Sequence, residues 1–416
     1  MPSNIDNSTT SYSEQLYQSS VASKELPLPG DDAIRHSKNL IDTIKNEIEK
    51  NLGSISFQRY MELALYAPGL GYYAAGSAKL GEEGDFVTAP EISALFSQSL
   101  ANAILPALEL DEEPVILEVG AGRGRMAADI LLFLKKENKL PKEYWILELS
   151  ADLRERQKQT IGMLAPDLLS KVKWLDELPE KFSGVVLANE LLDAMPVQLF
   201  QKKENDLNEI NVVWREDSFY FQFNSSFDAR LISRVQQIES ELEATLSSDY
   251  ISEVNFSAEG WIKSIAEHLQ QGVVILIDYG FPRHEYYHAQ RQQGTLMCHY
   301  RHRAHPDAFV YPGLQDITAH VDFTAMADAA LDANMRVIGY TNQASFLMGA
   351  GLLELSAMNE GSVSEQDLTA QMALAGQIKK LTLPHEMGEL FKVIGFSKNC
   401  DITLPAFQLR DLREYL

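Results

Sequence analysis

The chain has few cysteines and no long apolar run. Its 416 residues include two cysteines, Cys298 and Cys400, too few for a disulfide framework and suited to a reducing compartment. No apolar stretch approaches the ~18–20 residues that a membrane-spanning helix needs. The N-terminal residues lack the apolar core of a signal peptide and have no arginine before Arg35, unlike a mitochondrial presequence. We therefore expect a cytoplasmic protein that does not insert into a membrane.

Basic residues are scarce relative to acidic ones. Lys and Arg number 36 against 59 Asp and Glu, so the formal net charge is −23. Such a chain repels a phosphate backbone, which argues against a nucleic-acid partner and favours a basic or neutral substrate. The hydrophobic fraction of 45% is ordinary for a globular protein and allows a sizeable core.

The spacing of apolar residues predicts an α/β fold. Helical spacing marks residues 33–51, 55–67 and 91–108, around a loop rich in Gly and Tyr at 69–90. From residue 114, short apolar runs alternate with helical patterns, which predicts a mostly parallel, Rossmann-like sheet with a final antiparallel strand. The strands are expected at 114–120, 143–149, 171–178, 184–191 and 272–280.

Changes in composition suggest how the chain is divided. Residues 201–260 contain a hairpin pattern and a helical pattern between two sheet strands, and they are interpreted as an inserted arm. The expected parts are a disordered tail at 1–25, an N-terminal helical cap with a lid at 26–110, the main domain at 111–200 and 261–416, and a smaller lobe at 201–260.

The strongest chemical signal is the glycine-rich segment EVGAGRG at 118–124. It follows a predicted strand and opens a predicted helix, as ligand-cradling loops do. A dinucleotide fingerprint would need a small residue where Arg125 stands, and a Walker motif is absent. The E-x-G-x-G-x-G form is instead found in S-adenosylmethionine-dependent methyltransferases, with Glu148 at the end of the next strand as the acid for the ribose hydroxyls. The simpler alternative is a tight strand–helix turn without a ligand.

Several longer motifs resemble one family. The resemblance is carried by GYYAAGSAKLGEEGDFVTAPEIS (71–93), LEVGAGRG (117–124), LANELLDAMPVQLF (187–200), LIDYG (276–280), PGLQDITAHVDF (312–323) and MGELFKVIGF (387–396). The chain resembles a bacterial-type (MidA-like) member of the class I methyltransferase family that includes the mitochondrial complex I assembly arginine methyltransferase. That resemblance implies S-adenosyl-L-methionine as cofactor, protein arginine methylation and a link to respiratory-complex assembly.

The resemblance also implies roles for single residues. The cofactor loop corresponds to Glu118, Gly120, Gly122 and Gly124, and the ribose acid to Glu148. A segment over the cofactor corresponds to Gly84, Asp85, Phe86 and Thr88. The site that holds the methyl acceptor corresponds to Asn189 and Glu190.

The loop NELLDAMP offers the chemistry that an arginine acceptor demands. A guanidinium is protonated and delocalised, so it is a poor nucleophile that carboxylates must orient. Glu190 is the preferred clamp; Asp193 and Asp278 are weaker candidates, because Asp193 could simply cap a turn and Asp278 could simply hold a loop. The N-P-P-Y motif of amide and nucleobase methyltransferases is absent from this position.

Other interpretations remain open at this point. The segment CHYRHRAHPDAF places His299, His302 and His305 three residues apart, but it has no acid between the histidines, so no metal is predicted and a basic loop is preferred. Asp316, Thr318, His320 and Asp322 have family counterparts without a role that the residues define. The competing functions are a small-molecule methyltransferase, an assembly or binding protein stabilised by the cofactor, and a less favoured NAD-dependent oxidoreductase.

Overall fold

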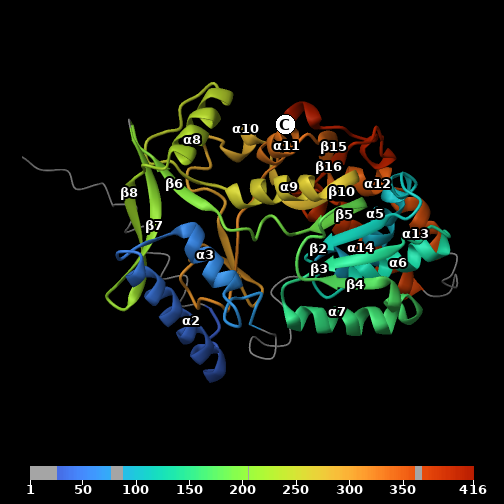
Figure 1. Ribbon diagram of the computed structural model, residues 1–416, viewed down its shortest axis with the longest axis horizontal. Helices are drawn as coiled ribbons and strands as arrows, with labels where there is room; N and C mark the ends of the chain where they lie inside the picture. The colour runs from blue at the N-terminus through green and yellow to red at the C-terminus, as the bar shows by residue number, and fades with distance from the viewer. Residues whose placement is uncertain (1–25, 76–87, 205, 361–367) are drawn as a thin grey trace, which may run out of the picture.

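The computed structural model describes residues 26–75, 88–204, 206–360 and 368–416, which form two lobes (Figure 1). The larger lobe is built on an eight-stranded sheet in the order β15-β16-β10-β5-β2-β3-β4, with β14 paired to the end of β10. Its strands are β2 (Val115–Val119), β3 (Glu143–Leu147), β4 (Val172–Leu175), β5 (Phe182–Asn189), β10 (Leu269–Phe281), β14 (Val321–Asp322), β15 (Arg336–Asn342) and β16 (Phe391–Lys398).

The pairing of these strands confirms the predicted fold class. Neighbouring strands in the run β10-β5-β2-β3-β4 are parallel, whereas β16 runs antiparallel to both β10 and β15. All five residues of β2 are buried, as expected of a parallel strand covered on both faces. The chain leaves β2 and β5 in opposite directions across the sheet, so their carboxyl ends frame the crevice in which such folds bind ligands.

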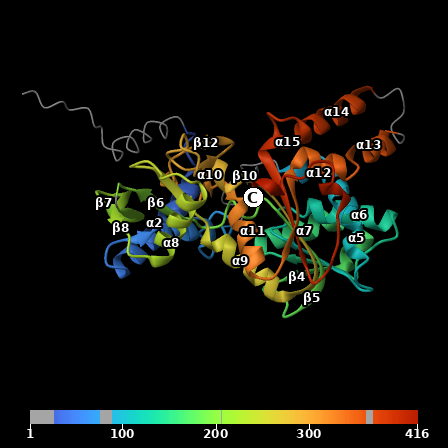
Figure 2. The same cartoon turned by 90° about the horizontal axis from the view of Figure 1, so that it is seen from above.

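Helices cover both faces of this sheet. One apolar core includes residues of α5 (Ala94–Leu108), α6 (Arg125–Lys136), α7 (Ala151–Leu164) and α12 (Gln343–Gly349). The core on the opposite face includes residues of α9 (Phe256–His268) and α11 (Phe323–Asp332). Figure 2 shows α13 (Leu352–Glu360) and α14 (Leu368–Thr382) at the edge of the larger lobe, beside α12. The short helices are α4 (Ala89–Ile92), α10 (Arg283–Tyr286) and α15 (Met387–Leu390), with 3-10 turns η3 (Pro166–Lys171), η4 (Pro405–Phe407) and η5 (Arg413–Tyr415).

The smaller lobe combines most of the expected insertion at 201–260 with part of the C-terminal region, and it also includes N-terminal helices that were expected to cap the cofactor. Its antiparallel sheet runs β1-β7-β6-β9, with β8 on β7. Its core also receives the N-terminal helices and a three-stranded sheet from residues 297–318. Conversely, α9 begins within the expected insertion but packs on the main sheet. The elements of this lobe are α2 (Asp31–Lys50), β1 (Ile55–Ser56), α3 (Phe57–Tyr66), β6 (Gln198–Lys202), β7 (Leu207–Arg215), β8 (Ser218–Ser225), α8 (Ala229–Glu241), β9 (Ile251–Val254), β11 (Met297–Tyr300), β12 (Arg303–His305) and β13 (Asp316–Thr318).

The expected N-terminal cap is likewise shared between the lobes. Helices α2 and α3 pack in the smaller lobe, whereas α5 packs on the main sheet. The single helix predicted over 91–108 is divided at Ser93, whose extended backbone ends α4. The Ser93 hydroxyl then accepts a hydrogen bond from the Leu95 N–H and caps α5, as serine commonly does.

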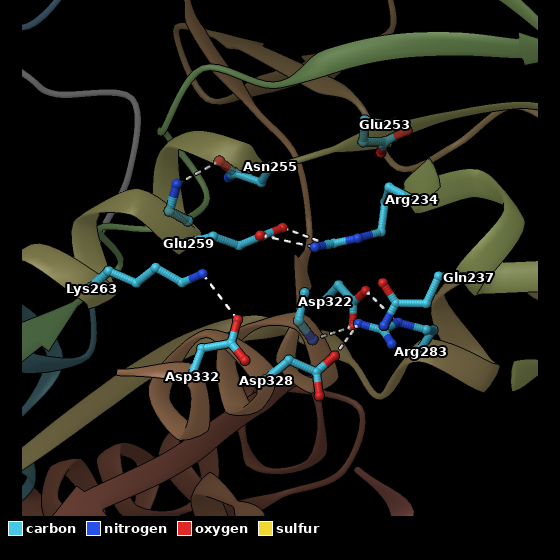
Figure 3. Close-up of polar contacts among 12 residues, drawn as sticks. Arg234, Gln237, Glu253, Asn255, Glu259, Lys263, Arg283, Asp322, Asp328 and Asp332 are labelled. Atoms are coloured by element: carbon cyan, nitrogen blue, oxygen red, sulfur yellow. Dashed lines mark hydrogen bonds and ion pairs between the residues drawn. The ribbon is translucent and has the colours of Figure 1, made fainter. Parts of the chain in front are cut away.

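Ion pairs join α8 and α10 to the helices of the larger lobe (Figure 3). Arg234 on α8 forms a bidentate pair with Glu259 on α9. Arg283, which is 3% exposed, contacts Asp322 at 3.3 Å, Asp328 on α11 at 2.8 Å, and Glu241 on α8. These contacts fix the position of the arm relative to the main sheet.

Candidate functional site

The glycine-rich loop leaves the carboxyl end of β2 in a conformation that requires glycine. Gly120, Gly122 and Gly124 have φ values of 72°, 50° and 81°. At Gly124 an added Cβ would lie 3.0 Å from the Gln157 Cα, so close packing against α7 excludes a side chain. At Gly122 an added Cβ would meet no atom within 4 Å, so this glycine borders open space. The loop therefore has one glycine required by packing and one that leaves room for a ligand.

Glu148 lies beside this open space at the end of β3. Its carboxylate accepts hydrogen bonds from the Ser150 N–H at 2.9 Å and from Gln157 Nε2 at 3.1 Å. Gln157 also donates to the Gly122 carbonyl at 2.9 Å, and the Trp174 indole holds its amide oxygen at 2.9 Å. Burial raises the pKa of Glu148. Gln157 thus ties the acid to the glycine loop, a role that no motif in the sequence indicated.

Glu118 lies beneath the same loop in the core of the sheet. It is 1% exposed and accepts a hydrogen bond from the Tyr144 hydroxyl at 2.7 Å. Burial raises its pKa to about 7, an effect that the Tyr144 hydrogen bond partly opposes. Glu118 is therefore positioned to stabilise the glycine-rich loop from within the core of the sheet.

These residues fit S-adenosyl-L-methionine. The backbone of Gly120 and Gly122 can approach the cofactor closely, and the oxygens of Glu148 can accept hydrogen bonds from ribose hydroxyls. Leu149, the neighbour of Glu148, is an apolar side chain that is 79% exposed.

A substitution at Gly122 tests this cradle. An added Cβ at Gly122 projects into the open space that the ligand is proposed to fill, so we expect Gly122→Ala to weaken S-adenosylhomocysteine binding by about tenfold. Gly260→Ala is the matched control, because Gly260 lies in α9 and its added Cβ also meets no atom within 4 Å. Calorimetric titration of both variants measures the effect, and equal affinities would contradict the proposed position of the ligand.

Glu190 occupies the carboxyl end of β5 in an uncommon backbone conformation. Its φ is 51°, and its N–H donates to the Ile277 carbonyl at 2.9 Å on the neighbouring strand. Its Oε1 accepts from Asn189 Nδ2 at 3.0 Å, and the Ala89 N–H at the start of α4 also stabilises its charge. Burial, and then the charge of Asp193, raises the pKa of Glu190 to about 7. Strained backbones of this kind cluster at functional sites.

Asp193 and Asp278 lie together behind Glu190 but differ in their contacts. Asp278 accepts hydrogen bonds from the N–H groups of Leu192 and Asp193 at 2.9 and 3.2 Å, so it holds the loop. Asp193 accepts from the Tyr279 hydroxyl, while its buried Oδ1 has no hydrogen-bond partner among the described residues. Burial raises the pKa of Asp193 to about 6 and that of Asp278 well above its usual range. Asp193 is thus better placed than Asp278 to bind an acceptor.

One tyrosine of the smaller lobe contacts this loop, and a second tyrosine stacks on the first. The rings of Tyr66 and Tyr73 stack with centroids 5.6 Å apart. The Tyr66 hydroxyl donates to the Ala194 carbonyl at 2.9 Å, and the Tyr73 hydroxyl donates to the buried Asp316 at 2.8 Å. Burial and the charges of Asp316 and Asp193 raise the pKa of Tyr66. Sequence reasoning missed both tyrosines and Tyr279, and it named Asp316 without a role.

Other candidate residues lie elsewhere or outside the described residues. Gly84, Asp85 and Phe86 fall within 76–87, outside the described residues, whereas Thr88 precedes α4 without a side-chain cap. Asp322 pairs with Arg283, and the ring of His320 packs between Tyr279 and Phe281.

The histidine-rich segment forms the β11–β12 hairpin. Burial lowers the pKa of His299 to about 4 and also lowers that of His305. Within the described ranges, no group of three His, Cys, Asp or Glu side chains could hold a metal ion.

The fold and the site together define a Rossmann-like methyltransferase that binds S-adenosyl-L-methionine. The match to known proteins agrees: residues 99–341 fit the model of a family of S-adenosyl-L-methionine-dependent methyltransferases. A Burkholderia thailandensis protein solved with S-adenosyl-homocysteine bound is 44% identical, with a TM-score of 0.88 over 94% of this chain and 100% of that one. The chain belongs to this family of S-adenosyl-L-methionine-dependent methyltransferases.

The curated relatives are more distant. The mitochondrial protein arginine methyltransferase NDUFAF7 of Mus musculus is 29% identical over 382 residues, covering 82% of this chain and 80% of that protein. Its Homo sapiens counterpart is 26% identical over 375 residues, with coverage of 82% of this chain and 80% of that protein.

Among the described residues, no helix is long and apolar enough to span a membrane.

Proposed function

We propose that this methyltransferase modifies an arginine side chain of a protein substrate. The observation that carries the proposal is the buried Oδ1 of Asp193, close to Glu190, which has no hydrogen-bond partner among the residues that the structure describes. Among the described residues, neither carboxylate nor Asp278 forms an ion pair with a lysine or arginine. Asp193 and Asp278 are buried, and buried carboxylates are costly without a cation, which an incoming guanidinium supplies.

The side chains of this site suit guanidinium chemistry. Glu190 and Asp193 can accept N–H bonds from two edges of the group, which orients one nitrogen and draws charge away from it. In the transfer, a C–N bond forms, the sulfonium C–S bond breaks, and the guanidinium loses one proton. Glu190, with a pKa raised to about 7, can accept that proton or pass it to water.

The activity is expected to depend on pH through Glu190. Below about pH 7 the free enzyme carries a neutral Glu190, which holds a cation poorly, so kcat/KM rises as the pH increases through that value. A bound cation lowers this pKa, so the rise in kcat lies at lower pH than the rise in kcat/KM. Initial rates measured across the pH range check this prediction, and a kcat/KM that stays flat between about pH 6 and 8 would contradict it.

Labelled methyl transfer tests the proposed acceptor. The purified chain is incubated with methyl-labelled S-adenosyl-L-methionine and lysate proteins, which are then hydrolysed to amino acids. Label in methylarginine supports the proposal, whereas label in another residue or only in small molecules would overturn it. The names of the curated relatives support arginine as the acceptor.

The proposal also covers where in the cell the reaction takes place. We propose a cytoplasmic location, supported by two cysteines that both remain free in the fold. The link to respiratory-complex assembly stays an expectation from the family resemblance. Fractionation of cells expressing the tagged chain tests the location.

A further inference from the structure

A cavity opens between the main sheet and the C-terminal segment. Its volume is about 480 Å³. Its walls come from the end of β10 and the residues that follow it, from β15 and β16, and from the segments 384–390 and 410–415. Asp278 of the acceptor site pairs in register with Lys392, which lines this cavity. The cavity therefore lies one strand away from the methyl-acceptor carboxylates.

Lys392 is a buried cation without an acidic partner. It is 8% exposed, and its ammonium donates to the backbone carbonyl of Glu389. No carboxylate lies within ion-pair distance of Lys392 in the described part of the chain. Burial lowers its pKa. Glu285 and Glu389 also line the cavity, but neither forms an ion pair with Lys392 in the described part of the chain. Buried charges are normally paired, so this ammonium points to an external anion.

Tyr340 supplies a second polar group in the same cavity. It is 1% exposed, and its buried hydroxyl has no hydrogen-bond partner among the described residues. In the β15–β16 pairing, Tyr340 faces Ile394 and Asn342 faces Lys392, so Tyr340 and Lys392 are diagonal neighbours on one face of the sheet. A hydroxyl donor and an ammonium on one wall match the oxygens of a carboxylate.

The other residues that line the cavity limit the chemical class of ligand that it can bind. Phe281, Pro282, Leu412 and Tyr415 provide apolar and aromatic surface. Glu389 is already engaged, because it accepts a hydrogen bond from Asn342 and lies 3.6 Å from Arg410. Exposed Glu285 adds a negative charge at the lining, which disfavours a multiply charged anion such as phosphate.

We propose that this cavity binds a single carboxylate carried on an apolar or aromatic body, with Lys392 and Tyr340 as its ligands. The carboxylate has two conceivable sources with the same chemistry. One is an acidic side chain of the substrate protein close to the methylated residue, and the other is a free small carboxylate. The proposal does not rest on arginine as the methyl acceptor.

Direct binding tests the site without a methyl-transfer assay. Phenylacetate is titrated into the full chain saturated with S-adenosylhomocysteine. Phenethylamine serves as a probe of opposite charge, and inorganic phosphate serves as a probe with a higher negative charge. We expect saturable binding of phenylacetate alone. Lys392→Met should weaken it by about tenfold or more, and Tyr340→Phe by about two- to tenfold. Equal binding of phenethylamine, or unchanged affinity in both variants, would overturn the proposal.

A matched lysine separates this effect from a general loss of charge. Lys398 lies on the same strand and donates to the Ala333 carbonyl at 2.7 Å, so Lys398→Met should leave phenylacetate binding unchanged. Retained S-adenosylhomocysteine binding shows that each variant is folded. If Lys392→Met fails to fold, Tyr340→Phe, which removes only a hydroxyl, carries the test.

Competition distinguishes the two sources. If a side chain of the substrate protein occupies the cavity, phenylacetate raises the KM for protein methylation. If a free carboxylate is the ligand, phenylacetate binds without changing that KM. Both results support a carboxylate site, and a failure of methyl transfer itself would bear only on the proposed function.

Discussion

Replacing Glu190 with Gln is expected to lower methyl transfer by about 10²–10⁴-fold while S-adenosylhomocysteine still binds. The amide keeps the size of the side chain and can still accept from Asn189 Nδ2. It loses the negative charge that orients the guanidinium and the basic oxygen that can take its proton. Single-turnover rates with labelled cofactor, measured beside calorimetric titration, separate the loss of chemistry from a loss of binding.

A control glutamate at the other end of the same strand isolates the effect. Glu180 is exposed and precedes the amino end of β5, far along the strand from Glu190, so Glu180→Gln should retain full activity. Wild-type turnover in Glu190→Gln would show that Glu190 does not clamp the acceptor. Asp193, whose Oδ1 lacks a partner among the described residues, would then be the carboxylate to test next.

Local patterns predicted the main sheet and the cofactor loop. The alternation of short apolar runs with helical spacing is encoded within each segment, so β2 and β3 lie close to the expected residues and α6 follows the glycine-rich segment as expected. The conformation of Gly120, Gly122 and Gly124 likewise follows from residue type, since glycine adopts positive φ at little cost. Glu148 as the ribose acid and Glu190 as the acceptor clamp remain predictions that the described geometry accommodates.

Contacts between distant residues could not be predicted from local patterns. Strand β1 pairs with β7, so the N-terminal helices join the lobe formed by the inserted segment. The pairing of Tyr279 with Asp193 spans 86 residues, and that of Tyr73 with Asp316 spans 243. Such pairs depend on the order of strands and on how the lobes pack, which periodicity does not report. Only a structure that contains these long-range contacts shows that the Asp193 Oδ1 has no hydrogen-bond partner among the described residues.

Removing the Arg283 side chain is expected to cost about 3–5 kcal/mol of the free energy of unfolding. Arg283→Ala leaves Asp322, which is 8% exposed, as a buried carboxylate without its cation. Glu241 and Asp328 are over 40% exposed at their side chains, so water compensates most of their loss. The main cost therefore comes from Asp322. Denaturant unfolding, monitored with S-adenosylhomocysteine absent, measures the change.

The ion pair of Lys263 with Asp332 supplies the matched control for Arg283 (Figure 3). Its side chains are 45% and 68% exposed, so Lys263→Ala should change stability by less than about 1 kcal/mol. Similar losses of unfolding free energy for both variants would mean that the ion pairs of Arg283 contribute no more than an exposed ion pair does. A large loss for Arg283 alone would show that burial of Asp322 makes this contact between α10, α8 and α11 necessary. Because Asp322 follows His320, whose ring packs on Tyr279, we expect the same variant to disturb the acceptor loop as well as the joint between the lobes.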